Sequence, residues 1–200
     1  GLPKGVLNVV NGGKEAVDTL LKDERVQAVS FVGSTAIAKY IYKTASENDK
    51  RCQALGGAKN HAIVMQDAEM ENTVNALIGA AFGSSGERCM AISVAVAVGS
   101  ETADNLIAGL KSKMHDLKVG NFDNSKNDFG PLITKDHMKK VKKYITSAEA
   151  QGADIVVDGR SVTVKGCENG FYVGGTLIDN VKASMESYKN EIFGPVLQVV

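Results

Sequence analysis

A cysteine stands between a glycine-containing turn and a long apolar run in residues 84–100, SSGERCMAISVAVAVGS. The thiolate of Cys89 could act as a nucleophile, because the small residues at 84–86 let backbone N–H groups come close to a reacting atom. Arg88 adds a positive charge beside the sulfur, which favours the thiolate form. The alternative is an inert cysteine buried at the start of a core strand, since free cysteine is one of the most buried residue types.

The remaining cysteines and the histidines do not suggest a second reactive site. Cys52 and Cys167 lack the setting of Cys89, and we expect them to be structural. Three widely spaced cysteines without a CxxC pair are typical of reduced thiols in a cytosol-like compartment, and we expect the bacterial cytoplasm or the mitochondrial matrix. His61, His115 and His137 do not have the spacing of zinc ligands, so we expect no metal and assign these side chains no role.

The chain is balanced in charge, with 23 basic and 23 acidic residues among 200, and 44% of its residues are hydrophobic. This composition can build a core in one large domain or two lobes, and it does not favour nucleic acid or an anionic membrane as a partner. No apolar run approaches the roughly 20 residues of a membrane helix. The chain begins without a methionine and ends inside the apolar run FGPVLQVV, so we expect it to be a piece of a longer polypeptide.

Apolar periodicity predicts an alternation of strands and helices. We expect helices at 13–23, 34–48, 69–82, 101–118 and 135–151. We expect strands at 6–10, 26–33, 91–99, 153–159, 171–180 and 195–200, with a further strand after the glycine pair in 55–68. This alternation is typical of an α/β fold in which helices flank a parallel sheet.

Five short motifs stand along the chain: FVGST at 31–35, LGGAKNHAIV at 55–64, GERCMA at 86–91, FGPLI at 129–133 and EIFGPV at 191–196. In this order and spacing they resemble the aldehyde dehydrogenase superfamily over essentially all 200 residues. GAKNH together with GERCMA is most similar to the CoA-acylating branch, the methylmalonate-semialdehyde dehydrogenases. The resemblance implies a three-layer α/β sheet with flanking helices. It also implies that residues 1–56 end a Rossmann-like NAD-binding domain and that 57–200 form a catalytic domain truncated at its C-terminal end.

The resemblance makes Cys89 the catalytic nucleophile. In the family, the cysteine at this position attacks the aldehyde carbonyl, and the thiohemiacetal then gives a hydride to the nicotinamide and becomes a thioester. The backbone N–H of Cys89 is implied to help hold the oxyanion. Arg88 could hold the carboxylate of a semialdehyde acid, and a structural ion pair is an equal alternative.

The resemblance also implies a set of NAD-binding residues: Gly33, Ser34, Ile37, Leu55, Gly56, Glu191 and Phe193. The first three surround the pyrophosphate and adenine at a helix start, where unpaired N–H groups favour anions. Leu55 and Gly56 lie where the family's chain passes the nicotinamide. Glu191 accepts hydrogen bonds from the nicotinamide ribose, and Phe193 lies against the ring. The alternatives are an ordinary helix cap at Ser34, a solvated acid at 191 and a core aromatic at 193.

Ala54 departs from the pattern of the hydrolytic family members, which have a glutamate there to activate water. General-base help of this kind is worth about 10²- to 10⁴-fold. We therefore expect slow hydrolysis of the thioester and transfer of the acyl group to coenzyme A. Glu87 could replace the missing base, but a surface acid near a turn is the favoured interpretation.

These features imply NAD-dependent oxidation of methylmalonate or malonate semialdehyde to propionyl-CoA or acetyl-CoA with loss of CO₂, as in valine or inositol breakdown. The resemblance implies a homodimer or homotetramer of full-length chains. Two alternatives remain open. One is a catalytically inactive fragment that serves only as a binding or assembly module, and the other is a CoA-independent hydrolytic dehydrogenase that uses another base.

Overall fold

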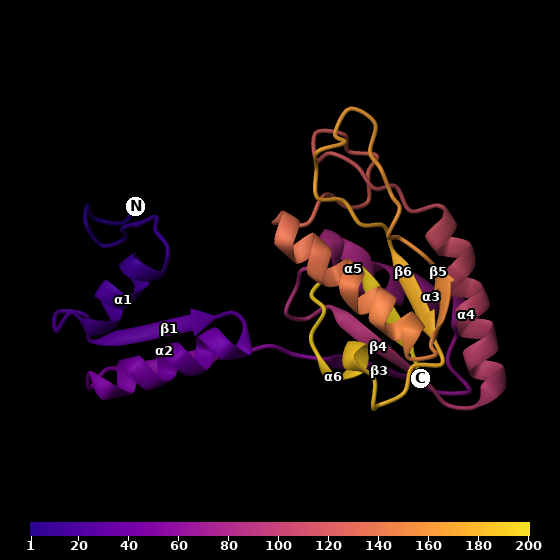
Figure 1. Cartoon of the computed structure of the whole chain (residues 1–200), viewed down its shortest axis with the longest axis horizontal. Coiled ribbons are helices and arrows are strands. Elements are labelled where there is room, and N and C mark those ends of the chain that lie inside the picture. Colours follow the sequence, from indigo (N-terminus) through magenta and orange to yellow (C-terminus); the bar gives the residue numbers. More distant parts are fainter. The chain divides into compact units, whose positions relative to one another are not determined.

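The computed structural model describes all 200 residues, which form two compact units, Gly1–Gly57 and Ala58–Val200 (Figure 1). The first unit has a sheet of two strands and the second a sheet of five. No helix of the chain is both long and apolar enough to cross a bilayer. Each unit is thus an α/β assembly with a sheet of its own.

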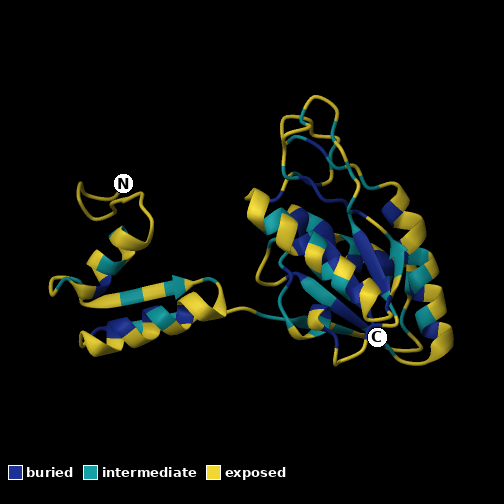
Figure 2. Cartoon of the chain, viewed as in Figure 1, coloured by how far each residue is buried: buried dark blue, intermediate teal, exposed yellow.

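The first unit is a strand–helix–strand element preceded by a short helix. Its elements are α1 (Lys14–Lys22), β1 (Ala28–Val32), α2 (Thr35–Glu47) and β2 (Arg51–Leu55). The two strands are parallel neighbours, because α2 carries the chain back to the starting edge. Alternate side chains of β1, Val29 and Phe31, pack on a small core of Leu21, Ile41 and Ala45, and the others are exposed (Figure 2).

Two strand predictions in this unit need correction. Residues 6–10 are exposed and form no strand, because no neighbouring strand receives their backbone hydrogen bonds. Conversely, β2 carries no strand signal in the sequence. Its exposed positions include Arg51 and Gln53, and its half-buried positions are the small Cys52 and Ala54.

The sheet of the second unit has the strand order β3-β4-β7-β6-β5. Its strands are β3 (Asn60–Val64), β4 (Ile92–Ala97), β5 (Asp154–Val157), β6 (Thr176–Asp179) and β7 (Val196–Val199). Four strands are parallel, and β5 runs antiparallel to β6 at one edge. The predicted parallel sheet is therefore wrong at this edge, where a loop without a helix joins β5 to β6.

Helices cover both faces of this sheet (Figure 1). They are α3 (Met70–Phe82) and α4 (Ser100–His115) on one face, and α5 (Lys135–Ala150) with the short α6 (Glu186–Lys189) on the other. Neighbouring strand residues point to opposite faces, so Leu177 packs under α3 and α4 while Ile178 packs under α5. The three-layer α/β arrangement predicted from the sequence is confirmed.

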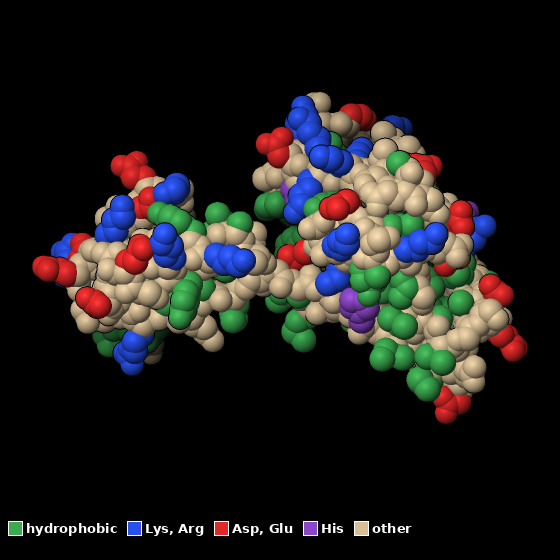
Figure 3. Space-filling model, turned by 60° about the horizontal axis from the view of Figure 1, so that its bottom comes forward, with side chains coloured by type: hydrophobic (Ala, Val, Ile, Leu, Met, Phe, Trp, Pro, Cys, Tyr) green, Lys and Arg blue, Asp and Glu red, His purple; other side chains and the backbone are tan.

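The opposite edge of this sheet is open. Strand β3 has only one neighbouring strand, and it leaves Ile63 68% exposed, with Met65 53% exposed just beyond its end. Figure 3 shows hydrophobic side chains gathered on one face of this unit. An edge strand of this kind keeps backbone N–H and C=O groups free.

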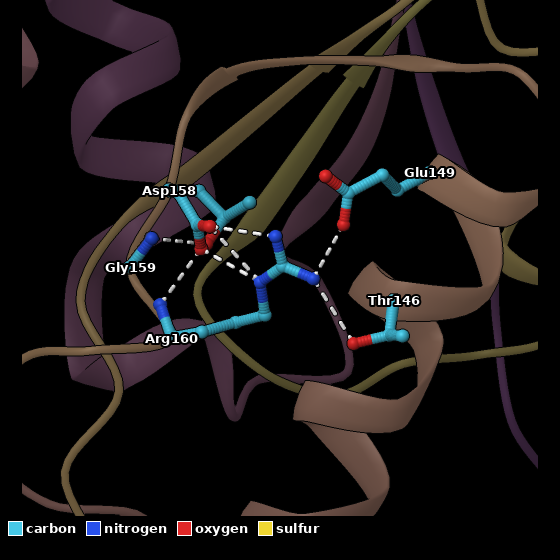
Figure 4. Close-up of polar contacts among 6 residues, drawn as sticks. Thr146, Glu149, Asp158, Gly159 and Arg160 are labelled. Carbon is cyan, nitrogen blue, oxygen red and sulfur yellow. Dashed lines mark hydrogen bonds and ion pairs between the residues drawn. The ribbon is translucent and has the colours of Figure 1, made fainter.

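A charged cluster fastens the end of α5 to the loop after β5 (Figure 4). Arg160 donates to both carboxylate oxygens of Asp158, and it donates to Glu149 Oε2 at 2.7 Å. It also donates to Thr146 Oγ1 at 3.0 Å, and its guanidinium holds the pKa of Asp158 below the usual value. These contacts link the last turns of α5 to the loop after β5.

Candidate active site

The segment before Cys89 has an unusual backbone. Ser84, Ser85 and Gly86 have φ values of 51°, 57° and 68°, which is the left-handed region. This conformation costs about 1–2 kcal/mol for each residue with a Cβ, and it persists only where the surroundings enforce it. Ser85 is buried and donates from Oγ to the carbonyl of Gly130 at 2.7 Å.

Gly86 is the tightest point of this turn. A Cβ on Gly86 would lie 2.2 Å from the carbonyl oxygen of Gly194, so no other residue fits without moving backbone. The turn that precedes Cys89 therefore packs backbone to backbone against the EIFGPV segment. The sequence predicts a close backbone approach here, and the structure shows that the approach is to Gly194.

Cys89 itself is exposed. It lies in a turn that is closed by the hydrogen bond from Ala91 N to Arg88 O at 3.1 Å, directly before β4. The N–H of Cys89 makes no hydrogen bond within the chain. The structure thus excludes a cysteine sealed in the core and leaves both the thiol and the amide available to a ligand.

Arg88 is exposed and has no carboxylate partner. Its Nε and Nη2 atoms donate to Ser84 Oγ at 3.2 and 3.1 Å, and its guanidinium lies over Gly83. The alternative of a structural ion pair is therefore wrong. A guanidinium that is positioned but unpaired can bind a carboxylate of a ligand.

Three consecutive residues connect the two halves of this site. The N–H of Ala58 donates to Glu191 Oε1 at 3.2 Å. Lys59 Nζ donates to the carbonyls of Ser187 and Asn190 at 2.6 and 2.9 Å, and burial lowers the pKa of this amine to about 8. The sequence analysis missed these contacts because the partners lie more than 100 positions away.

Asn60 is the third of these residues. Its Nδ2 donates to the carbonyls of Cys89 and Ala91, both at 2.9 Å. One side-chain amide therefore holds the Cys89 turn on both sides of Met90. The amide belongs to the GAKNH motif, which was a family signature in the sequence without an assigned physical role.

Cys89, Arg88, Glu191 and Phe193 line one hollow of the second unit. Its enclosed space is about 10 Å³, which is the room of a single water molecule. Glu191 is half-buried and hydrogen-bonded, not a freely solvated acid. Phe193 has a φ of 59°, which is rare for an aromatic residue and typical of functional sites.

His137 also reaches this site, although the sequence analysis assigns it no role. Its Nε2 lies 2.5 Å from the carbonyl oxygen of Phe193 and 3.5 Å from Glu87 Oε1. Glu87 accepts from the N–H of Ile133 at 3.4 Å, and burial raises the pKa of its carboxyl. The interpretation of Glu87 as a surface acid is therefore wrong, because only 16% of its side chain is exposed.

The first unit places the remaining predicted residues around the start of α2. Ser34 has the backbone conformation of an N-cap, but its hydroxyl makes no cap hydrogen bond. The alternative of an ordinary side-chain cap is thus not observed. The N–H of Gly33 donates to the carbonyl of Leu55 at 3.1 Å, and Ile37 is 48% exposed.

Gly56 lies against the same turn. A Cβ on Gly56 would come within 3.1 Å of Thr35 Oγ1, which accepts a hydrogen bond from the N–H of Gly57 at 3.0 Å. Leu55 is 50% exposed beside it. The first unit therefore brings together Gly33, Ser34, Ile37, Leu55 and Gly56.

Comparisons with known proteins agree with the fold. The aldehyde dehydrogenase family model matches residues 1–200. A malonate-semialdehyde dehydrogenase of Pseudomonas aeruginosa is 60% identical over 200 residues, which are all of this chain and 40% of that protein. The crystal structure of a methylmalonate-semialdehyde dehydrogenase from Oceanimonas doudoroffii superposes with a TM-score of 0.97 at 69% identity, and it is matched over all of this chain and 41% of its own.

A protein from Sinorhizobium meliloti that was crystallised with NAD has a TM-score of 0.97 and 55% identity, again over all of this chain and 41% of that one. The chain thus spans about two fifths of the length of these relatives. The family resemblance and the fold predicted from the five motifs are confirmed.

Proposed function

Because the chain belongs to the aldehyde dehydrogenase family, we propose that it supplies the nucleophile and part of the cofactor site of an enzyme that oxidises malonate or methylmalonate semialdehyde. One observation carries the proposal: an exposed Cys89 shares a hollow with Arg88, Glu191 and Phe193. The names of the relatives described above support the substrate class.

The residues present fit NAD. At the start of α2, the free N–H groups and the unbonded Ser34 hydroxyl suit a diphosphate. Gly33 precedes this start, and the Phe31 ring fills the place where a Cβ of Gly33 would stand. We assign Gly1–Gly57 to the end of the NAD-binding domain on this basis, with Ile37 near the adenine. The crystal structure of the Sinorhizobium meliloti relative with NAD supports the cofactor.

In the first unit, Leu55 and Gly56 are also assigned to the cofactor. In the second unit, Glu191 receives the ribose hydroxyls and Phe193 supports the nicotinamide end. Glu191 can do so because Oε1 alone is occupied, by the N–H of Ala58. When bound, NAD supplies a hydride acceptor. The task of the protein residues is to hold it there.

Cys89 carries out the first covalent step. Its thiolate forms a bond to the carbonyl carbon of the aldehyde, and the electron pair of the C=O bond moves to the oxygen. The unpaired N–H of Cys89 donates to this oxyanion. Arg88, which has no carboxylate partner in the chain, binds the carboxylate of the semialdehyde.

Loss of a hydride from the adduct carbon to the bound acceptor would re-form the C=O bond and leave a thioester on Cys89. The acyl group of this thioester then transfers to coenzyme A. Ala54 has no carboxylate that could take a proton from water, so hydrolysis of the thioester is slow. The thiolate of coenzyme A attacks the thioester carbon, the bond to Cys89 sulfur breaks, and the cysteine thiolate is restored. The C–C bond to the substrate carboxylate breaks and CO₂ leaves. Its electron pair passes to the α carbon as an enolate of the thioester, which takes up a proton from water and gives acetyl-CoA or propionyl-CoA.

The test uses the full-length protein with NAD and malonate semialdehyde, with and without coenzyme A. We expect coenzyme A to raise steady-state NADH formation by about 100-fold, with a single burst in its absence. Cys89→Ser abolishes the burst, and Cys167→Ser serves as the control that retains it.

Two results would contradict the proposal. Turnover at equal speed without coenzyme A indicates a hydrolytic enzyme with another base. No burst from a folded full-length protein indicates the binding or assembly module instead.

A further inference from the structure

His137 lies between two segments that are far apart in the sequence. It sits in the first turn of α5, where its N–H donates to Thr134 Oγ1 at 3.1 Å. Its side chain is 15% exposed, and its imidazole faces Glu87 on one segment and Phe193 on the other. The cap hydrogen bond holds the backbone of His137, and the contacts with Phe193 and Glu87 orient its ring.

The contacts of the ring define which nitrogen carries hydrogen. The carbonyl oxygen of Phe193, 2.5 Å from Nε2, can only accept a hydrogen bond. Nε2 must therefore be protonated, and the oxygen of Glu87 at 3.5 Å is a second acceptor on the same side. The imidazole also stands edge-on to the Phe193 ring, with centroids 6.2 Å apart and an interplanar angle of 64°.

The hydrogen bond from His137 ends on Phe193, the residue of the EIFGPV segment that has a positive φ. Phe193 has a left-handed backbone, and its carbonyl direction depends on that conformation. The next residue, Gly194, touches the left-handed Gly86 of the Cys89 turn. The two strained turns thus meet at Gly86 and Gly194, and they are linked a second time through Glu87 and His137.

We propose that His137 is a positioning residue that locks the left-handed turn at Phe193 to the turn that carries Cys89. It acts through the Phe193 carbonyl and the Glu87 carboxylate and does not touch substrate. The inference rests on the proposed function only in that Phe193 supports the nicotinamide end. The mechanical link between the two turns exists whatever the reaction is.

The experiment compares His137→Ala, His137→Gln and His115→Ala in the full-length protein. Glutamine can donate from near the Nε2 position, and His115 is a 91% exposed side chain on α4 that serves as the control. Two quantities are measured: the rate of the first-turnover burst of NADH at saturating NAD, and hydrogen–deuterium exchange of segments 84–91 and 191–196.

We expect His137→Ala to slow the burst by about 10- to 100-fold and to speed exchange in both segments, since small misplacements of reacting groups have effects of this size. His137→Gln stays within about 3-fold of the wild type, because it restores the donor. His115→Ala changes neither quantity.

The inference is overturned if His137→Gln is as impaired as His137→Ala, which would indicate packing alone, or if His137→Ala behaves as the wild type. If the wild type makes no NADH, the proposed function fails, and exchange decides this inference by itself. Faster exchange in both segments supports the link, whereas a change in one segment or in neither overturns it.

Discussion

The turn that begins α2 and the turn that carries Cys89 both contain glycine and both precede a regular element, but they are held in different ways. At α2, the N–H of Gly33 donates to the carbonyl of Leu55, and Thr35 Oγ1 accepts from Gly57. These contacts come from the neighbouring strand end and leave the Ser34 hydroxyl and the first N–H groups free.

The turn at Cys89 is held by contacts with several segments that are distant in the sequence. Asn60 binds its carbonyls from β3, Ser85 is tied to Gly130, and Gly86 is pressed against Gly194. The first site thus presents free donors on an unstrained backbone, which suits a bound anion. The second fixes a strained backbone so that one thiol is exposed in a defined place, which suits a covalent step.

The largest effect that we expect comes from filling the contact between Gly86 and Gly194. It tests whether this contact, and not only the left-handed backbone, is needed for stability and for the reactivity of Cys89. Gly86→Ala adds a Cβ 2.2 Å from the Gly194 oxygen at a φ of 68°. We expect it to lower the free energy of unfolding by about 3 kcal/mol or more and to abolish alkylation of Cys89 at the native rate. Urea unfolding and iodoacetamide kinetics measure the two effects.

Gly152→Ala is the matched control. Gly152 also has a positive φ, 89°, but nothing lies within 4 Å of its added Cβ. We expect a loss of only about 1–2 kcal/mol from the left-handed backbone, with normal alkylation of Cys89. Equal losses at the two glycines would mean that the contact with Gly194 is unimportant.

The second prediction concerns a variant that removes the hydrogen bond from Asn60 to the Cys89 carbonyl. Asn60→Asp keeps the shape of the side chain but turns an oxygen toward the carbonyls of Cys89 and Ala91, both 2.9 Å from the present donor. We expect kcat/KM to fall about 100-fold, which corresponds to about 2.7 kcal/mol. Steady-state kinetics of the full-length protein measure this.

Asn127→Asp provides the comparison for that variant. The Asn127 amide binds the carbonyl of Asn121, only six positions away, at 2.8 Å. We expect a change in stability without a change in kcat/KM. If both variants lose stability and neither loses kcat/KM, Asn60 does not position the Cys89 turn for catalysis.

The difference between the two sites also explains what the sequence could predict. The elements with a periodic apolar face were predicted with small errors at their ends, such as α3 at Met70–Phe82 for the expected 69–82. The start of α2 was predicted because its contacts are formed by residues in two short motifs. Strand β2 was missed because Arg51 and Gln53 occupy exposed positions and the residues at its half-buried positions are small.

The long-range hydrogen bonds around Cys89 could not be predicted, because no local sequence pattern encodes them. His137 reads as one polar residue in a lysine-rich helix, yet it contacts Phe193, 56 positions away. Lys59 binds carbonyls 128 and 131 positions along the chain. Such contacts depend on how helices pack on the sheet, which the spacing of residues in one segment does not specify.

The third prediction concerns two helix starts whose N-cap residues are both extended but make different side-chain hydrogen bonds. Ser34 makes no cap hydrogen bond, whereas Thr134 accepts from the N–H of His137 at 3.1 Å. We expect Thr134→Ala to lower the free energy of unfolding by about 1 kcal/mol. We expect Ser34→Ala to change it by only ~0.3 kcal/mol. Ser34→Ala instead raises KM for NAD by about 5- to 10-fold, since it removes a donor to the diphosphate. A Ser34 variant with an unchanged KM and a full capping loss would make Ser34 an ordinary cap.

The last prediction concerns the titration of Lys59, whose buried amine has no counterpart at the start of α2. Burial lowers the pKa of Lys59 from 10.5 to about 8, so the folded chain binds fewer protons than the unfolded chain between these values. The free energy of unfolding therefore rises with pH between 8 and 10.5. This contribution of Lys59 is lost again as the pH falls through 8. The neutral amine still has two N–H donors for the carbonyls of Ser187 and Asn190, so deprotonation keeps both hydrogen bonds.

We expect the stability of the wild type relative to Lys59→Met to increase by about 1–2 kcal/mol from pH 8 to 10.5. Urea unfolding of both proteins at several pH values measures it, and Lys113→Met, an exposed lysine on α4, corrects for the other groups that titrate in this range. A difference that does not change with pH would show that the amine stays charged between its two carbonyls. The Lys59 amine would then be held by an ion–dipole contact and not by two neutral hydrogen bonds. Its contribution to the free energy of unfolding would not change with pH in this range.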